Sequence, residues 1–123
     1  MEKFTAEVEK VENVTAVRLS GELDANTAVS ADDALQEAIT QAPNKALLID
    51  YTDLHYISSA GLGVILSSLH LCKQHNIKVA FFGLQPKIKN VFAILGIEKI
   101  INTAPNEEEA LAFLNNGSGQ NGH

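Results

Sequence analysis

The sequence has one cysteine, three prolines, no tryptophan and no long hydrophobic run. The lone Cys72 cannot form a disulfide within the chain, which fits a reducing compartment, so we expect the protein in the cytoplasm. The first residues lack the apolar core of a signal peptide. The most apolar helical segment, residues 60–72, is interrupted by polar side chains and is shorter than the roughly 20 residues that a bilayer requires. We therefore expect neither a signal peptide nor insertion into a membrane.

Basic residues are also scarce. Nine Lys and Arg stand against 15 Asp and Glu, which gives a net charge of −6 and argues against nucleic acid as a partner. His70 and His75 are five residues apart on a predicted helix and face different ways, so with one cysteine the sequence predicts no metal site. Neither common glycine-rich nucleotide motif is present, and we expect no cofactor.

What the sequence does contain is regular patterning over 123 residues, 46% of them hydrophobic and 20% charged, as expected of one globular domain. Alternating apolar residues predict strands, and apolar residues spaced by three and four predict helices. The predicted strands cover residues 4–9, 14–20, 46–49, 78–83 and 99–101, and the predicted helices cover 27–41, 59–72, 86–95 and 105–114. The third strand is expected to end in the polar residues 50–53, and Asp53 and His55 are expected to lie in the loop before Ser59.

The predicted order is β-β-α-β-α-β-α-β-α. Repeated alternation of strand and helix indicates right-handed crossovers, so the fold class is α/β, with a mostly parallel central sheet, an N-terminal hairpin and about four helices packed against the sheet. One domain should span residues 1–115, and the polar, glycine-containing residues 116–123 are predicted to be a disordered tail.

The serine pair Ser58-Ser59 lies where the second long helix should begin. Helix capping is the ordinary role of such serines. A helix N-terminus also carries unpaired N–H groups and a partial positive charge, so it would tolerate a phosphoryl group on Ser59, which would oppose any partner packed there. Gly61 and Gly63 lack side chains beside the pair, and we expect this to allow a partner's backbone to approach closely.

A second polar segment, Gly21 to Thr27, follows the second predicted strand. A turn followed by an Asn or Thr helix cap explains it by itself. If the second and third strands are neighbours, however, Asp24, Asn26 and Thr27 would lie beside the serine pair. Both interpretations can hold together.

These two motifs, Gly21-Glu22-Leu23-Asp24 onward and Ser58-Ser59-Ala60-Gly61-Leu62-Gly63, occur in an order that resembles the STAS domain of bacterial anti-sigma factor antagonists. The order of elements resembles that family from about residue 3 to residue 114. The late segment Leu95-Gly96-Ile97-Glu98-Lys99-Ile100-Ile101 is similar to a stretch of the same family.

The resemblance implies a partner switch without enzymatic activity of its own. In that family the unphosphorylated antagonist binds an anti-sigma serine kinase, and a sigma factor is released. The ATP is bound by the kinase and not by the antagonist. The kinase phosphorylates a serine at this helix start and breaks the complex, and a serine phosphatase restores the antagonist. A protein of this kind is expected to be a monomer when free.

The family motif is usually Asp-Ser-(Ser or Thr)-Gly-Leu. Aligned on Gly61 and Leu62, the resemblance places the phosphorylated residue at Ser59, with Ser58 as the second candidate. Ser58 replaces the usual aspartate and Ala60 the second hydroxyl residue. The resemblance further implies partner contacts by Asp24, Asn26 and Thr27 in one loop and by Ser58, Gly61 and Leu62 in the other.

Two other functions remain open from the residues. STAS domains also serve as constitutive regulatory subunits of transporters or of switches without a sigma factor, in which case Ser59 need not be modified. A small hydrolase or transferase would instead use Ser59 as a nucleophile, but the sequence around it lacks the G-x-S-x-G motif of such enzymes.

Overall fold

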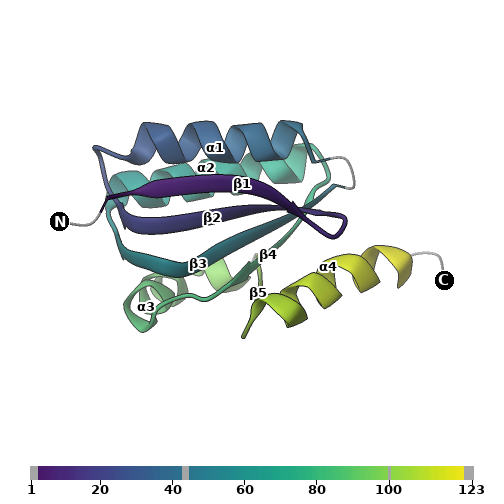
Figure 1. The fold of residues 1–123 in the computed structure, drawn as a ribbon. Helices are drawn as coiled ribbons and strands as arrows, with labels where there is room; N and C mark the ends of the chain where they lie inside the picture. Colours follow the sequence, from purple (N-terminus) through teal and green to yellow (C-terminus); the bar gives the residue numbers. More distant parts are fainter. Residues whose placement is uncertain (1–2, 43–44, 100, 121–123) are drawn as a thin grey trace.

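The structure, a computed structural model, describes residues 3–42, 45–99 and 101–120. Its strands and helices follow the predicted order (Figure 1). They are β1 (Thr5–Val11), β2 (Val14–Leu23), α1 (Ala28–Thr40), β3 (Ala46–Ile57), α2 (Ser59–Gln74), β4 (Lys78–Phe82), α3 (Pro86–Ile94), the 3-10 turn η1 (Ile97–Lys99), β5 (Asn102–Ala104) and α4 (Glu107–Gln120).

The strands form one sheet in the order β1-β2-β3-β4-β5. The hairpin pair β1 and β2 is antiparallel, and every later pair is parallel, which confirms the predicted fold class. From β2 to β5 the chain always steps to the next position in the same direction. Right-handed crossovers made in one direction place their helices on one face of a sheet, and α1 and α2 do lie together on one face (Figure 1).

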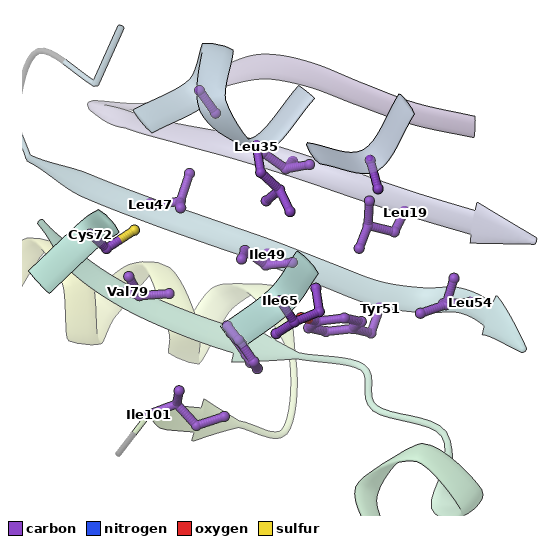
Figure 2. Close-up of a cluster of buried hydrophobic side chains, with 14 of the residues drawn as sticks. Leu19, Leu35, Leu47, Ile49, Tyr51, Leu54, Ile65, Cys72, Val79 and Ile101 are labelled. Atoms are coloured by element: carbon purple, nitrogen blue, oxygen red, sulfur yellow. The ribbon is translucent and has the colours of Figure 1, made fainter. Parts of the chain in front are cut away.

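The face under α1 and α2 holds the larger hydrophobic core. Leu35 from α1, Ile65 from α2 and Ile49 from β3 are among its fully buried side chains (Figure 2). Phe92 from α3 joins this core, where its ring meets Tyr51 edge-on with centroids 5.9 Å apart. The opposite face is covered by α4, and its core is smaller.

The strand β3 is longer than the sequence predicted. It continues to Ile57 instead of ending at Ile49, so Asp53 and His55 are exposed residues of a strand and the expected loop is absent there. The reason is that β2 also extends, and Leu23 still pairs with Ile57. Two register shifts, between Arg18 and Ser20 and between Gly21 and Glu22, let the pairing continue past the polar residues of β3.

The last strand begins three residues later than the sequence predicts. The predicted strand over 99–101 is wrong: Lys99 ends η1, the side chain of Ile101 is buried in the larger core, and β5 begins at Asn102. Ile100 lies outside the described residues. Ile101 fits the apolar pattern of a strand because it is buried, although it precedes the paired segment.

The helix α4 reaches Gln120, beyond the predicted end of the domain at residue 115. Residues 121–123 of the expected tail lie outside the described residues, and the division into a domain and a tail stays a prediction. In the parts of the chain that are described, no helix is both long and apolar enough to cross a membrane. Nor do those parts bring three or more His, Cys, Asp or Glu together as a metal site.

Candidate functional site: the serine edge of the sheet

Ser58 is the N-cap of α2. Its backbone is extended, and its hydroxyl oxygen accepts a hydrogen bond from the Gly61 N–H at 3.3 Å. Its own N–H donates to the Leu23 carbonyl at 2.9 Å, so the residue also ties the helix start to the end of β2. A side chain used in this way satisfies one of the free N–H groups of the first helical turn. The capping role expected for the serine pair therefore belongs to Ser58.

Ser59 occupies the first helical position and is exposed. Within the described residues its hydroxyl has no hydrogen-bond partner, in contrast to the hydroxyl of Ser58. The first turn of α2 contains no acidic residue. The partial positive charge of the helix N-terminus is therefore not neutralised within that turn, which is the electrostatic setting that favours an added anion.

The two glycines after the serines have different surroundings. Gly61 is buried, and a Cβ built on it would lie 2.7 Å from both the Cγ atom and the carbonyl oxygen of Leu23. The expectation that Gly61 leaves room for a partner is thus wrong, because the space is filled by the chain's own β2. A Cβ on exposed Gly63 would have no described atom within 4 Å, so the open surface lies there.

The loop from Asp24 to Thr27 is held by its own hydrogen bonds. One carboxylate oxygen of Asp24 accepts from the N–H groups of Asn26, at 2.9 Å, and Thr27, at 3.2 Å. The Thr27 hydroxyl accepts from the Asp24 N–H at 2.9 Å and donates to the Glu22 carbonyl at 2.8 Å. Thr27 precedes α1 but makes no side-chain cap bond to it. Asp24 and Thr27 therefore fix the loop, and Asn26 is its exposed polar side chain.

The two loops lie side by side, as expected if their strands are neighbours. Leu23 at the end of β2 pairs with Ile57 at the end of β3. The N–H of the next residue, Ser58, donates a hydrogen bond to the Leu23 carbonyl, so the two loops begin next to each other. Both α1 and α2 begin at this end of the sheet (Figure 1). We call this region, made of residues 24–29 and 56–63, the serine edge.

Sequence reasoning missed two apolar residues of the serine edge. Val29 in the first turn of α1 is 71% exposed, and the Tyr56 side chain at the end of β3 is 49% exposed. Leu66, about two turns further along α2 than Ser59, is 42% exposed. The signal for Tyr56 was an aromatic residue in the polar segment before the serines, and the signal for Val29 was an apolar residue off the core stripe of its helix. Leu66 gave no signal, because it fits the core stripe of α2. Exposed apolar side chains beside polar loops are typical of a protein-binding surface.

Burial shifts the pKa of two core side chains, Cys72 and Tyr51. Burial raises the pKa of the Cys72 thiol to about 11, so this cysteine stays protonated at neutral pH. Burial likewise raises the pKa of Tyr51. Cys72 is therefore a core side chain and not a reactive thiol.

Together these features define an α/β domain with an exposed serine at the start of a helix, beside a polar loop and exposed apolar side chains. The STAS domain family matches residues 5–110. An anti-sigma F factor antagonist of Paenibacillus polymyxa is 32% identical over 108 residues, which cover 88% of this chain and 92% of that protein. The chain belongs to the STAS-domain family of anti-sigma factor antagonists.

Solved structures share the fold. An anti-sigma factor antagonist from Mycobacterium paratuberculosis superimposes with a TM-score of 0.79 at 22% identity, over 92% of this chain and 95% of that one. The Bacillus cell fate determinant SpoIIAA in its phosphorylated form gives a TM-score of 0.68 at 22% identity, over 87% of this chain and 96% of that one.

Proposed function

We propose that the unphosphorylated protein binds an anti-sigma serine kinase through the serine edge, and that phosphorylation of Ser59 by this kinase ends the complex. Binding of the kinase would release its sigma factor, and a serine phosphatase would restore the antagonist. The observation that carries the proposal is the exposed Ser59 hydroxyl at the N-terminus of α2, next to a preformed polar loop and exposed apolar side chains.

Ser59 is the better candidate for modification than Ser58. The oxygen of Ser58 caps Gly61, and a phosphoryl group there would remove that cap and enter a half-buried position. Removing an N-cap bond costs about 1 kcal/mol. Ser59 can be phosphorylated while the cap of Ser58 stays in place.

The chemistry of a phosphoryl group explains how one modification would release a partner without unfolding the domain. The group adds about −1.5 to −2 charge at neutral pH. At the N-terminus of α2 this charge is favoured by about 0.3 to 1 kcal/mol. At a protein interface the same charged, hydrated group would repel a partner packed around Ser59, because it would have to be desolvated.

The remaining contacts have separate roles. Asp24 and Thr27 would act by holding the loop in one conformation, so that the loop loses little conformational entropy when the kinase binds. Asn26, together with the exposed Val29 and Tyr56, would touch the kinase directly. Leu62 is half-buried in the first turns of α2 and would add an apolar contact. Gly61 would contribute only through the fold.

The experiment is to incubate the protein with an anti-sigma kinase and ATP and to map the phosphorylated residue by mass spectrometry. The matched variants are Ser59→Ala and Ser58→Ala, each checked for folding by circular dichroism. We expect one phosphoryl group on the wild type and on Ser58→Ala, none on Ser59→Ala, and release of the kinase from the phosphorylated forms.

The other outcomes separate the alternatives. Phosphorylation of Ser58 alone would overturn the assignment of the site. A stable complex with no modification would favour a constitutive regulatory subunit. Covalent labelling of Ser59 by a serine-directed electrophile, with turnover lost in Ser59→Ala, would indicate an enzyme.

A further inference from the structure

The sheet has an open edge at β5, far from the hairpin. In the described part of the chain β5 pairs only with β4, so the other side of Asn102–Ala104 has no strand beside it. Alternate residues of such an edge direct their N–H and C=O groups outward, which makes the edge a template for another strand. Asn102 and Thr103 are exposed, so the template is accessible.

Two hollows flank this edge, one on each face of the sheet. The first, about 520 Å³, lies between α2 and the sheet and is lined by Leu66, Leu69, His70, Lys73, Val79 and Asn102 among others. The second, about 320 Å³, lies on the α4 face and is lined by Asn102, Thr103, Pro105, Glu109 and Phe113 among others. Asn102 borders both hollows.

This arrangement matches the geometry of an added strand. Successive side chains of a strand point to opposite faces of a sheet. A segment paired with β5 would therefore direct every second side chain into the α2-side hollow and the others into the α4-side hollow. Main-chain hydrogen bonds would hold the segment, and the two hollows would select its side chains.

The charged residues around the two hollows indicate which side chains an added strand should carry. His70, Lys73 and Lys78 line the α2-side hollow beside the apolar Leu66 and Leu69, and the Lys78 ammonium donates a hydrogen bond to the Phe113 carbonyl at 3.0 Å. Glu109 lines the α4-side hollow. Opposite charges across an interface favour pairing and like charges oppose it. The best occupant has apolar or acidic residues at alternate positions and basic residues between them.

The same charges disfavour a second copy of this chain. Two β5 strands related by a two-fold axis would be antiparallel, and both α2 helices would then lie on the same face, near each other. His70 and Lys73 of one copy would approach their equivalents in the other, and Glu109 would approach Glu109. A different protein with an extended segment fits the edge better.

We propose that the β5 edge binds an extended segment of a partner protein by strand addition, with acidic or apolar side chains in the α2-side hollow and basic ones in the α4-side hollow. The α2-side hollow begins at Leu66, about 10 Å along the helix from Ser59. The site is therefore distinct from the serine edge, and a partner could stay on β5 while Ser59 is free or modified.

The test uses the full chain labelled with ¹⁵N and the capped octapeptide Thr-Leu-Lys-Glu-Thr-Leu-Lys-Glu, followed by amide chemical shifts. We expect shifts at residues 101–104 and along Leu66 to Lys73, with none at Ser59. Two further peptides carry N-methyl groups at the odd or at the even positions. Strand addition uses the N–H groups of one side only, so one of the two should lose binding and the other should keep it.

Charge reversal gives a second readout that does not depend on the fold alone. Lys73→Glu and Glu109→Lys should each weaken binding by up to about fivefold, as expected for exposed ion pairs. The double variant should prefer the peptide in which Lys and Glu are exchanged. Lys87→Glu, on α3, is the matched control and should leave binding unchanged.

Several results would overturn the proposal. These are shifts confined to the serine edge, equal behaviour of the two N-methylated peptides, or no shift at about 2 mM peptide. Self-association of the free protein, seen by sedimentation and removed by Thr103→Glu, would assign the edge to a second copy instead.

Discussion

The hydrophobic cores on the two faces of the sheet differ in the size of their side chains. Under α1 and α2 lie large aliphatic side chains and the rings of Tyr51, Phe81 and Phe92, with centroids 4.9 to 6.0 Å apart. Under α4 the strands contribute many small residues, such as Ala16 and Ala80. The difference indicates that the first face supplies most of the stability, because apolar burial scales with the area removed from water.

On the α4 face, ion pairs of Arg18 add to the smaller hydrophobic core. The Arg18 guanidinium on β2 contacts Asp50 on β3 and Glu107 on α4, each at 2.8 Å, and also reaches Glu9 on β1. These carboxylates raise the pKa of Arg18, which stays charged. One cation therefore links three strands to α4. The serine edge belongs to the other face, since α1 and α2 both begin there.

The largest expected effect comes from two adjacent leucines of β3. Leu47 belongs to the core under α1 and α2, Leu48 belongs to the core under α4, and both are fully buried. Replacing either by alanine should lower the free energy of unfolding by about 2 to 5 kcal/mol. We expect Leu47→Ala to cost about 1 kcal/mol more, because its larger neighbours hold the cavity open, whereas the single helix α4 can move inward.

Urea unfolding of both variants measures this comparison, with an unchanged dependence on denaturant as the check on two-state behaviour. A greater loss for Leu48→Ala would show that the α4 face contributes more than its side chains suggest. Phosphorylation of Ser59 should persist in folded Leu48→Ala, because the change lies on the face away from α2.

The second prediction compares two glycines of the same helix. In Gly61→Ala the new methyl group would collide with the Leu23 carbonyl, and we expect a loss of about 1 to 3 kcal/mol despite better helix propensity. Gly63→Ala meets no described atom and should gain up to about 1 kcal/mol. Thermal unfolding of the pair decides this, and equal stability would contradict the close packing of α2 on β2.

Much of the fold and part of the site could be predicted from the sequence. The strand and helix order, the hairpin and the helix start at Ser58-Ser59 follow from local patterns, which the structure confirms. The length of β3 could not be predicted, because its polar second half is a strand only through its pairing with β2. The role of Gly61 was also hidden, since it depends on Leu23, which lies 38 positions away in the sequence.

The smallest expected effect is on the free energy of unfolding at alkaline pH. It arises from Cys72, which belongs to the core under α1 and α2. The folded protein holds the pKa of Cys72, under α2, at about 11, above the usual value of 9.0 for the free thiol. A pKa that is raised on folding stabilises the protein fully below the unfolded pKa, and this stabilisation is lost as the pH rises toward the folded pKa. The thiol ionises first in the unfolded chain, so unfolding becomes easier above pH 9.

Between pH 9 and pH 10 the loss due to Cys72 should be about 1 kcal/mol, since one pKa unit corresponds to about 1.4 kcal/mol. The Cys72→Ala variant should lack this part of the slope, although a small cavity lowers its stability at every pH. Tyr51→Phe is the matched control. It removes a buried hydroxyl that has no hydrogen-bond partner among the described residues, which changes stability at every pH. Burial also raises the pKa of Tyr51, but a phenol ionises only near pH 10, so the slope of stability with pH should differ from that of the wild type mainly above that pH. Urea midpoints at intervals from pH 8 to pH 10.5 measure both slopes. A Cys72→Ala variant with the slope of the wild type would mean that the thiol reaches water in the folded protein, through the hollow between α2 and the sheet.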